Sequence, residues 1–259
     1  MSVRNFTFLG TGTSVGVPML GCECRVCTSD DPRNHRFRCS VLLRLPAGNL
    51  LIDTGPELRL QLLRARVRAV HSVLFTHYHA DHLMGLDDLR PIGKIIGKPV
   101  PLYCTGEVEG KIRKTFSYAF DHEIAGAARG WVPNLAFQRI DDEPFEVLGE
   151  KVTPIPLIHA QFDVYGFRVG DVAYCTDVSE IPRKSWPRLE GLKVLILDAL
   201  RYHKHPAHFG LNEALDMIAK FRPERAYLTH MSHELEYEEV TRNLPSGVEL
   251  AYDGLSFDF

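Results

Sequence analysis

The sequence lacks any hydrophobic run long enough to cross a membrane: no stretch of its 259 residues approaches the roughly 18 apolar residues of a membrane span. The start of the chain, Met1 to Phe6, also lacks the long apolar core and small-residue cleavage site of a signal peptide. We therefore expect a cytoplasmic protein without a membrane partner.

The chain also lacks a strong excess of charge of either sign. Its formal net charge is −3, which gives no bulk electrostatic reason to expect nucleic-acid binding. Internal repeats, low-complexity tracts and long linkers are absent from the sequence as well, so we expect one domain over residues 1–259. Hydrophobic residues make up 45% of the chain and charged residues 24%, which is typical of a globular protein with a large core.

What the sequence does contain is a short cluster of metal-ligand side chains. His77, His79, Asp81 and His82 lie within six residues. The apolar, β-branched stretch 69–75 before them predicts a buried strand, and apolar residues at helical spacing in 83–89 predict a helix after them. The cluster is therefore predicted to lie on a strand-to-helix turn, where polar groups of a rigid scaffold commonly meet a ligand.

The spacing within this cluster has a chemical meaning. In an extended segment, residues two apart point the same way, so His77 and His79 can face one cation, whereas Asp81 and His82 can face another. Neutral imidazoles with a carboxylate suit zinc, manganese or iron. The alternative is a loop that is merely rich in histidine. With 12 histidines in the whole chain, four ligand types in six positions favour a metal site.

A second cluster consists of three cysteines, Cys22, Cys24 and Cys27. In a reducing compartment, cysteines serve as metal ligands or core residues more often than as disulfides. Three thiols within six residues can converge on one tetrahedral zinc, which needs a fourth ligand from elsewhere in the chain. Three free cysteines in a loop are the alternative. The isolated cysteines are expected to be small core residues: Cys39, Cys104 and Cys175.

The rest of the chain is predicted to form further strands and helices. Further strands are predicted at 3–9, 41–45, 49–52, 100–104, 137–140, 145–148, 151–157, 162–169, 172–175, 194–198 and 225–228. Helices are predicted at 56–66, 107–118 and 211–221, and another is expected to begin at His233. Residues 121–133 look irregular, and the segment beyond Asp177 is expected to contribute two strands.

Two features leave alternatives open. The glycine-rich segment Gly10 to Pro18 either approaches a phosphate or substrate, or forms a tight turn; it is not a P-loop, because no Gly-Lys-Ser/Thr ends it. Asp53, at the end of a predicted strand, either orients a metal-bound histidine or caps the helix predicted at 56–66.

The motif His-x-His-x-Asp-His after a hydrophobic strand resembles the metal signature of the metallo-β-lactamase superfamily. This resemblance implies an α/β fold, the αββα sandwich, with a dinuclear metal site at one edge of the sheets. It also implies the ligands. One metal is held by His77, His79 and His159, the second by Asp81, His82 and His230, and Asp177 bridges the two.

Such a site implies hydrolysis. Two cations a few ångströms apart lower the pKa of a shared water, giving a bridging hydroxide near neutral pH, and they neutralise charge on a phosphodiester or carbonyl. Asp81 is expected to serve in catalysis as well as in metal binding. The rival hypothesis is a non-catalytic metal-binding protein that kept the fold.

Within the superfamily, the chain most resembles the phosphoribosyl 1,2-cyclic phosphate phosphodiesterases of phosphonate metabolism. The shared segments are 10–12, 16–18, 21–24 with Cys27, 39–40, 76–79 with 81–82, 228–230 with 232–233, 244–247 and 253–254. The resemblance pairs the three cysteines with His233 around one structural zinc. It also implies a histidine that assists the departing oxygen, and His208 matches this position better than His203 or His205.

Other branches remain as alternatives. The tRNA 3′-processing endonucleases insert a long arm where this chain has only residues 160–176, and pyrroloquinoline-quinone biosynthesis protein B also has a cysteine–zinc site. We therefore expect a hydrolase of a small phosphate ester such as 5-phosphoribosyl 1,2-cyclic phosphate. Its cofactors would be two divalent ions, manganese, zinc or iron, and one structural zinc. A homodimer is left open.

Overall fold

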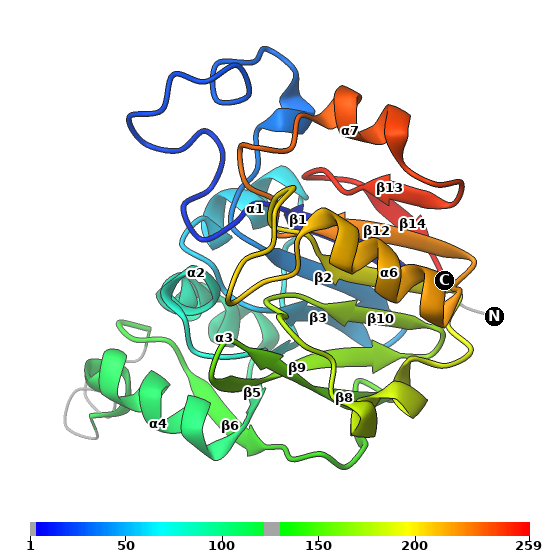
Figure 1. The fold of residues 1–259 in the computed structure, drawn as a ribbon. Helices are drawn as coiled ribbons and strands as arrows, with labels where there is room; N and C mark the ends of the chain where they lie inside the picture. Colours follow the sequence, from blue (N-terminus) through cyan, green and yellow to red (C-terminus); the bar gives the residue numbers. More distant parts are fainter. Residues whose placement is uncertain (1–3, 122–129) are drawn as a thin grey trace.

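The computed structural model describes residues 4–121 and 130–259, and the strands of these residues form two seven-stranded sheets (Figure 1). The first sheet has the order β14-β1-β2-β3-β4-β5-β6. Its strands are β1 Asn5–Gly10, β2 Ser40–Leu45, β3 Gly48–Ile52, β4 Ser72–Leu74, β5 Val100–Cys104, β6 Leu135–Arg139 and β14 Ser256–Asp258. The pairs from β14 to β3 are antiparallel, and those from β3 to β6 are parallel.

The second sheet has the order β13-β12-β11-β10-β9-β8-β7. Its strands are β7 Phe145–Val147, β8 Glu150–His159, β9 Phe162–Val169, β10 Val172–Cys175, β11 Val194–Asp198, β12 Arg225–Thr229 and β13 Val248–Leu250. Antiparallel pairing joins β7 to β10, and parallel pairing joins β10 to β13.

Helices connect these strands. The α-helices of the described residues are α1 Leu58–Arg64, α2 Ala80–Leu83, α3 Arg90–Ile96, α4 Gly106–Thr115, α6 Leu211–Phe221 and α7 Tyr237–Asn243. Short 3-10 helices lie at η1 Pro32–Asn34, η2 Leu86–Leu89, η3 Ser117–Phe120 and η4 Arg183–Leu189. No helix in this described part of the chain is long and apolar enough to span a bilayer.

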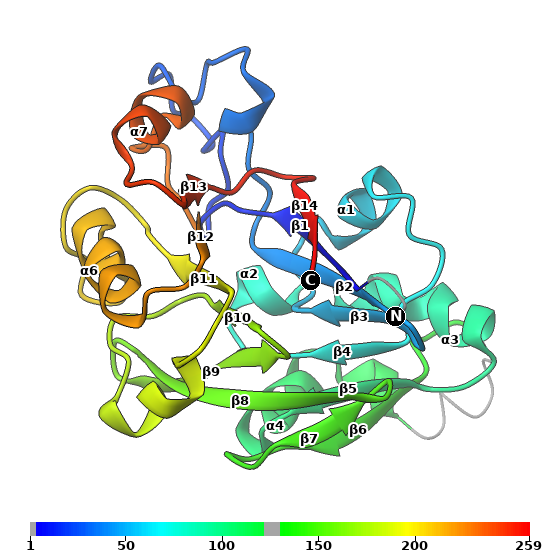
Figure 2. The same cartoon turned by 90° about the vertical axis from the view of Figure 1, so that its right-hand side faces the viewer.

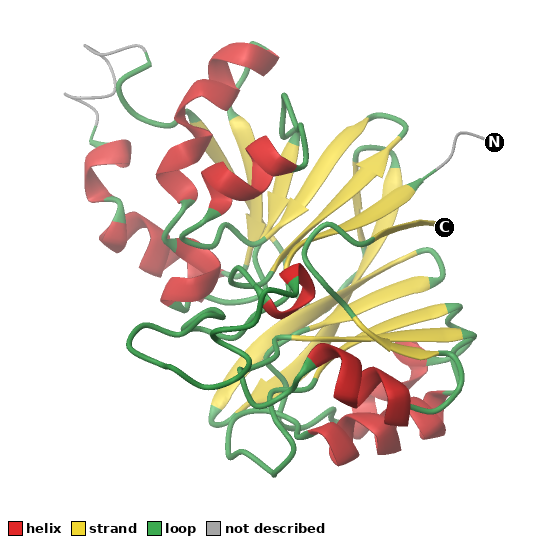
Figure 3. Cartoon of the chain, turned by 90° about the horizontal axis from the view of Figure 1, so that it is seen from above, coloured by secondary structure: helices red, strands yellow, loops and turns green. Residues whose placement is uncertain are grey.

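The two sheets face each other, with helices on both outer sides (Figures 2 and 3). Side chains alternate along each strand, because successive residues point to opposite faces. In β3, Leu50 and Ile52 join the core between the sheets, whereas Leu51 faces the helical layer. In β11, Val194 and Ile196 face the first sheet. The αββα sandwich expected from the sequence is confirmed.

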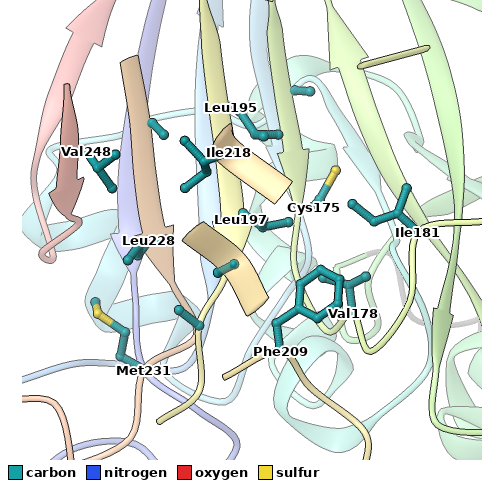
Figure 4. Packing of buried hydrophobic residues seen from close by; sticks show 14 of the residues in the cluster. Cys175, Val178, Ile181, Leu195, Leu197, Phe209, Ile218, Leu228, Met231 and Val248 are labelled. Atoms are coloured by element: carbon teal, nitrogen blue, oxygen red, sulfur yellow. The ribbon is translucent and has the colours of Figure 1, made fainter. Parts of the chain in front are cut away.

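The outer core of the second sheet shows how one helix is held. Ala214 and Ile218, four residues apart on α6, pack in the same buried cluster as Leu195, Leu197 and Leu228 of the strands (Figure 4). Burying a leucine or isoleucine side chain contributes on the order of 1.5–3 kcal/mol. The predicted bounds of this helix, 211–221, are confirmed.

The structure corrects three expectations. Residues 83–89 do not form one helix: α2 ends at Leu83, and η2 follows after Gly85. A Cβ on Gly85 would lie 2.1 Å from the carbonyl oxygen of Gly55, so the chain turns where it touches a neighbouring loop. Four strands, not two, follow Asp177. The helix expected at His233 begins at Tyr237. Of the segment predicted to be irregular, residues 122–129 lie outside the described residues.

Candidate metal centre

The predicted ligands lie where strands of both sheets end. His77 follows β4, His159 is the last residue of β8, Asp177 follows β10, and His230 follows β12. All four are at most 5% exposed. In open α/β sheets, ligands commonly bind outside the carboxyl ends of the strands.

The first group consists of His77, His79 and His159, whose candidate ligand nitrogens lie within 4.8 Å of one another. Their ring centroids are 4.5–5.6 Å apart. The Nδ1 of His159 lies 2.7 Å from the carbonyl oxygen of Ala207 and donates to it. This hydrogen bond fixes the tautomer and leaves the Nε2 of His159 with a free lone pair.

The second group consists of Asp81, His82, Asp177 and His230, again within 4.8 Å. The Nε2 of His82 lies 3.1 Å from the Oδ2 of Asp177, and the Nε2 of His230 lies 3.2 Å from its Oδ1. The same Oδ1 is 4.0 Å from the Nε2 of His159 in the first group. Asp177 thus lies between the two groups, in the position that the bridging role requires.

The donor set fits a pair of cations. The Nε2 atoms of His77, His82 and His230 are buried and have no hydrogen-bond partner among the described residues. Buried polar atoms are nearly always paired, because an unpaired one loses its hydration without compensation. Three unpaired imidazole nitrogens beside two carboxylates are what divalent zinc, manganese or iron would bind.

The electrostatics of the site favour positive charge. Burial by itself lowers the pKa of His82, but the carboxylates of Asp177, Asp81 and Asp53 outweigh it and hold that pKa well above its ordinary value. Burial would likewise raise the pKa of Asp177, but His230 and His82 hold it well below its usual range. By contrast, burial lowers the pKa of His77, which keeps its imidazole neutral.

Asp53 contacts His82 through Nδ1, the ring nitrogen that does not face Asp81 and Asp177. Its Oδ2 accepts from the Nδ1 of His82 at 2.7 Å and from the hydroxyl of Thr76 at 2.8 Å, and its Oδ1 accepts from the Thr76 amide at 2.9 Å. The residue that precedes α1 at its N-terminus is Glu57. Of the two hypotheses from the sequence, the structure therefore places Asp53 as the residue that orients His82.

Three residues of the site adopt left-handed backbone conformations: φ is 64° at Asp53, 53° at Asp177 and 58° at His230. Non-glycine residues rarely adopt this region, and such conformations are concentrated at functional sites. Each of the three follows directly on a strand or lies two residues past one. The left-handed conformation changes the direction of a side chain that would otherwise follow the alternating pattern of its strand.

His208 is placed beside both groups. Its Nδ1 lies 2.8 Å from the Oδ2 of Asp198, and its ring stacks on His230 with centroids 4.8 Å apart. Asp198 is fully buried at the end of β11, and the sequence prediction missed it. His205 lies with its ring 5.3 Å from that of His208, whereas His203 is exposed.

The cysteine cluster meets the expected histidine. The Nδ1 of His233 lies 3.1 Å from the Sγ of Cys22, 3.4 Å from that of Cys24 and 3.5 Å from that of Cys27. In a tetrahedral zinc site with bonds of about 2.0–2.3 Å, the ligand atoms are about 3.3–3.8 Å apart. The backbone N–H of Cys27 donates a hydrogen bond to the Sγ of Cys24, and this bond is the main cause that lowers the pKa of Cys24 to about 6. These four atoms therefore fit a structural zinc. The isolated Cys39, Cys104 and Cys175 are buried, as expected.

The glycine-rich loop is held against the same region by its backbone. A Cβ on Gly12 would lie 2.7 Å from the carbonyl oxygen of Arg36, and one on Gly10 would lie 2.0 Å from that of Arg38. The amide of Thr13 donates to the carbonyl of Met231, the neighbour of His230, at 3.1 Å. These glycines serve close packing of the backbone.

Comparisons with known proteins agree with this geometry. Residues 48–231 match the family model of the beta-lactamase superfamily domain. A crystal structure described as a new diphosphatase from the PhnP family superposes with a TM-score of 0.93 at 40% identity, covering 100% of this chain and 98% of that chain.

Two more distant likenesses add context. A curated octanoyltransferase from Porphyromonas gingivalis is 35% identical over 251 residues, which are 95% of this chain but 50% of that protein, so the chain spans half the length of this relative. The structure of Zn²⁺-bound PqqB from Methylobacterium extorquens has a TM-score of 0.76 at 21% identity, covering 98% of this chain and 100% of that chain, which shows a shared fold. Together with the ligand geometry, the family match leads to one conclusion: the chain belongs to the metallo-β-lactamase superfamily.

Proposed function

We propose that this chain is a metal-dependent phosphodiesterase that hydrolyses a small cyclic phosphate, such as 5-phosphoribosyl 1,2-cyclic phosphate. The superfamily fold and the likeness to a PhnP-family diphosphatase support a hydrolase. The observation that carries the finer proposal is the placement of the Asp198–His208 pair directly beside two ligand groups that share Asp177. A proton donor thus lies next to the position where a phosphoryl group would be held.

Two divalent ions fit the site. His77, His79 and His159 would hold one, Asp81, His82 and His230 the other, and Asp177 would contact both. When bound, such ions supply a water of lowered pKa and neutralise charge on a phosphoryl oxygen. The protein's own part is to orient the imidazoles. Asp53 does this for His82, and the carbonyl of Ala207 does it for His159.

His208 is the residue proposed to assist the departing oxygen. Because its Nδ1–H donates to Asp198, the Nε2 remains available to carry a proton to substrate. Asp198 also accepts from the amide of Val178 at 3.0 Å, which fixes the carboxylate in place. The amide of Phe209 donates to the carbonyl of Val178 at 2.7 Å, so the loop carrying His208 is tied to the strand end that carries Asp177.

The need for a proton donor distinguishes substrate classes. Opening a cyclic phosphodiester expels a sugar alkoxide, which is strongly basic and must be protonated as it leaves. Cleaving a diphosphate expels a phosphate, which is a far weaker base. The histidine–aspartate pair therefore favours an ester with an alkoxide leaving group. A diphosphatase is the second candidate, and the likeness to the PhnP-family diphosphatase favours it.

A tRNA-processing role is disfavoured by the short path between two ligands. The chain passes from His159 to Asp177 through the hairpin of β9 and β10 alone. This leaves no room for the long arm that tRNA 3′-processing endonucleases carry at this point. The formal net charge of −3 also supplies little attraction for a polyanion.

The test measures kcat/KM of the manganese-loaded protein on three substrates: ribose 1,2-cyclic phosphate, bis-p-nitrophenyl phosphate and a nucleoside diphosphate. His208→Ala is expected to lower the rate on the cyclic phosphate by about 10²–10⁴-fold, the usual share of general acid catalysis. On the p-nitrophenyl ester, whose leaving group departs without protonation, the loss should be far smaller.

His203→Ala is the matched control, since His203 is exposed on the same loop and outside both ligand groups. It is expected to keep the wild-type rate on all three substrates. Equal losses of His208→Ala on all substrates would reject the proton-donor role, and preference for the diphosphate would establish the second candidate. A fully metallated wild-type protein that hydrolyses none of the three would remove the enzyme hypothesis.

A further inference from the structure

Arg36 is a buried arginine with an unusual set of partners. Its side chain is among the largest that are fully buried, at 1% exposure. The guanidinium donates to the carbonyl oxygens of Ser232 at 2.7 Å and Leu235 at 2.6 Å, and more weakly to the amide oxygen of Asn34 at 3.3 Å. Within residues 4–121 and 130–259, it forms no ion pair with a carboxylate. A buried cation without a paired anion is costly, so its position requires an explanation.

The segment that Arg36 holds carries two ligands of different centres. Residues 230–235 begin with His230, of the predicted dinuclear site, and include His233, of the cysteine site. The amide of Met231 donates to Thr11 at 2.9 Å, and that of Ser232 donates to Leu200 at 2.8 Å, at the start of the loop that leads to His208. Figures 1 and 2 show the loop of residues 11–38 beside α7, the helix that begins at Tyr237 just after this segment.

Charge explains why a cation suits this position. A zinc ion with three thiolates and one neutral imidazole carries a single net negative charge. The charged groups that act on Arg36 are Asp253, Glu236, Asp31 and the thiol of Cys27. Burial lowers the pKa of Arg36 to about 10, so the guanidinium is still charged at neutral pH. Its charge would compensate the zinc–thiolate centre without touching it.

We propose that Arg36 is a positioning residue shared by the two metal centres. By holding the carbonyls of Ser232 and Leu235, it places His230 in the dinuclear site and His233 against the cysteines. In this proposal the dinuclear site takes its support from Arg36, so loss of the zinc alone would leave that site in place. This inference rests on the proposed function only through the ligand roles of His230 and His233.

The experiment compares three variants in metal binding. Cobalt titration reads the cysteine site through its thiolate-to-cobalt absorption band, and manganese titration by calorimetry reads the dinuclear site. Cys24→Ser should lose the thiolate band and keep manganese affinity. Arg36→Met should weaken both sites by up to about 10- to 100-fold, the loss seen when a direct partner of a metal ligand is removed.

Arg33→Met is the matched control. Arg33 lies three residues away, is 36% exposed in its side chain, and pairs with Asp31 and Glu238. It should leave both affinities unchanged. Arg36→Lys keeps the charge but replaces the planar fork with a single ammonium, so it should weaken both sites by less than Arg36→Met does.

Two results would overturn the proposal: a folded Arg36→Met protein that keeps its manganese affinity, or a Cys24→Ser protein that loses it as Arg36→Met does. If the Arg36 variants do not fold, NMR of the Cys24→Ser protein decides. The guanidinium protons of Arg36, which donate to the carbonyls of Ser232 and Leu235, should stay slow to exchange without the zinc, and fast exchange would overturn the proposal. Because none of these readouts uses hydrolysis, their failure is distinguishable from failure of the proposed function.

Discussion

Replacing Asp53 with asparagine tests how much the site depends on a carboxylate that would touch no metal. Asp53 is fully buried, and its two oxygens accept three hydrogen bonds, from the Thr76 amide, the Thr76 hydroxyl and the Nδ1 of His82. An asparagine has one acceptor oxygen and one donor nitrogen in the same space. Its φ of 64° is tolerated by asparagine as well as by aspartate, so the backbone should keep its conformation.

Either orientation of the new amide is unfavourable. If its nitrogen faces His82, the imidazole must accept at Nδ1 and carry its proton on Nε2, the atom that faces Asp81 and Asp177. If its oxygen faces His82, the buried amide of Thr76 loses its acceptor. The first outcome removes the lone pair needed for a metal. Changes in such supporting partners typically lower metal affinity by about 10–100-fold, or about 1.4–2.7 kcal/mol.

The assay is calorimetric titration of Mn²⁺ into protein stripped of metal, combined with urea unfolding to confirm that the variant is folded. Asp171→Asn is the control, because Asp171 is a partly exposed acid that pairs with Lys193, and such surface changes usually stay within about 0.5 kcal/mol. If Asp53→Asn binds Mn²⁺ within twofold of the wild-type protein, the orienting role of Asp53 is refuted.

Three further predictions concern the zinc, the pH dependence and the glycine loop. Cys24→Ser should lose about one zinc per chain by elemental analysis, and unchanged zinc would reject the cysteine site. Burial raises the pKa of Asp253 to about 6, so the folded state binds this proton more tightly than the unfolded state. The stability of the wild-type protein relative to Asp253→Asn should be greatest below about pH 4 and fall by up to about 3 kcal/mol as pH rises through 6; a constant difference in urea unfolding would contradict this. Gly12→Ala should cost about 1–3 kcal/mol in urea unfolding, because its Cβ would lie 2.7 Å from a carbonyl oxygen. Gly110→Ala, with open space around it in α4, should not destabilise.

Much of the fold follows from local patterns. The hairpin of β2 and β3 was predicted within two residues because two short apolar runs flank the turn residues Pro46-Ala47-Gly48. The helix α6 was predicted because Ala214 and Ile218 repeat at helical spacing. The residues of both clusters also came together as expected, since the family pattern specifies their order along the chain. Their roles as metal ligands remain predictions until metal is measured.

The parts that were missed depend on contacts between distant segments. Asp198 ends an apolar run and carries no motif; its partnership with His208 arises because the loop after β11 returns to the strand end. Strands β13 and β14 are three residues long and are defined by their neighbours in the two sheets. The turn at Gly85 follows from contact with Gly55, thirty positions earlier. No periodicity within a segment reports such contacts.

The most direct measurement is anomalous diffraction from crystals of the manganese-loaded protein. The proposed function predicts two adjacent manganese peaks on either side of the Asp177 carboxylate, one beside His77, His79 and His159 and the other beside Asp81, His82 and His230. A single peak, or peaks that Asp177 does not separate, would contradict the two-metal site on which the proposed hydrolysis depends.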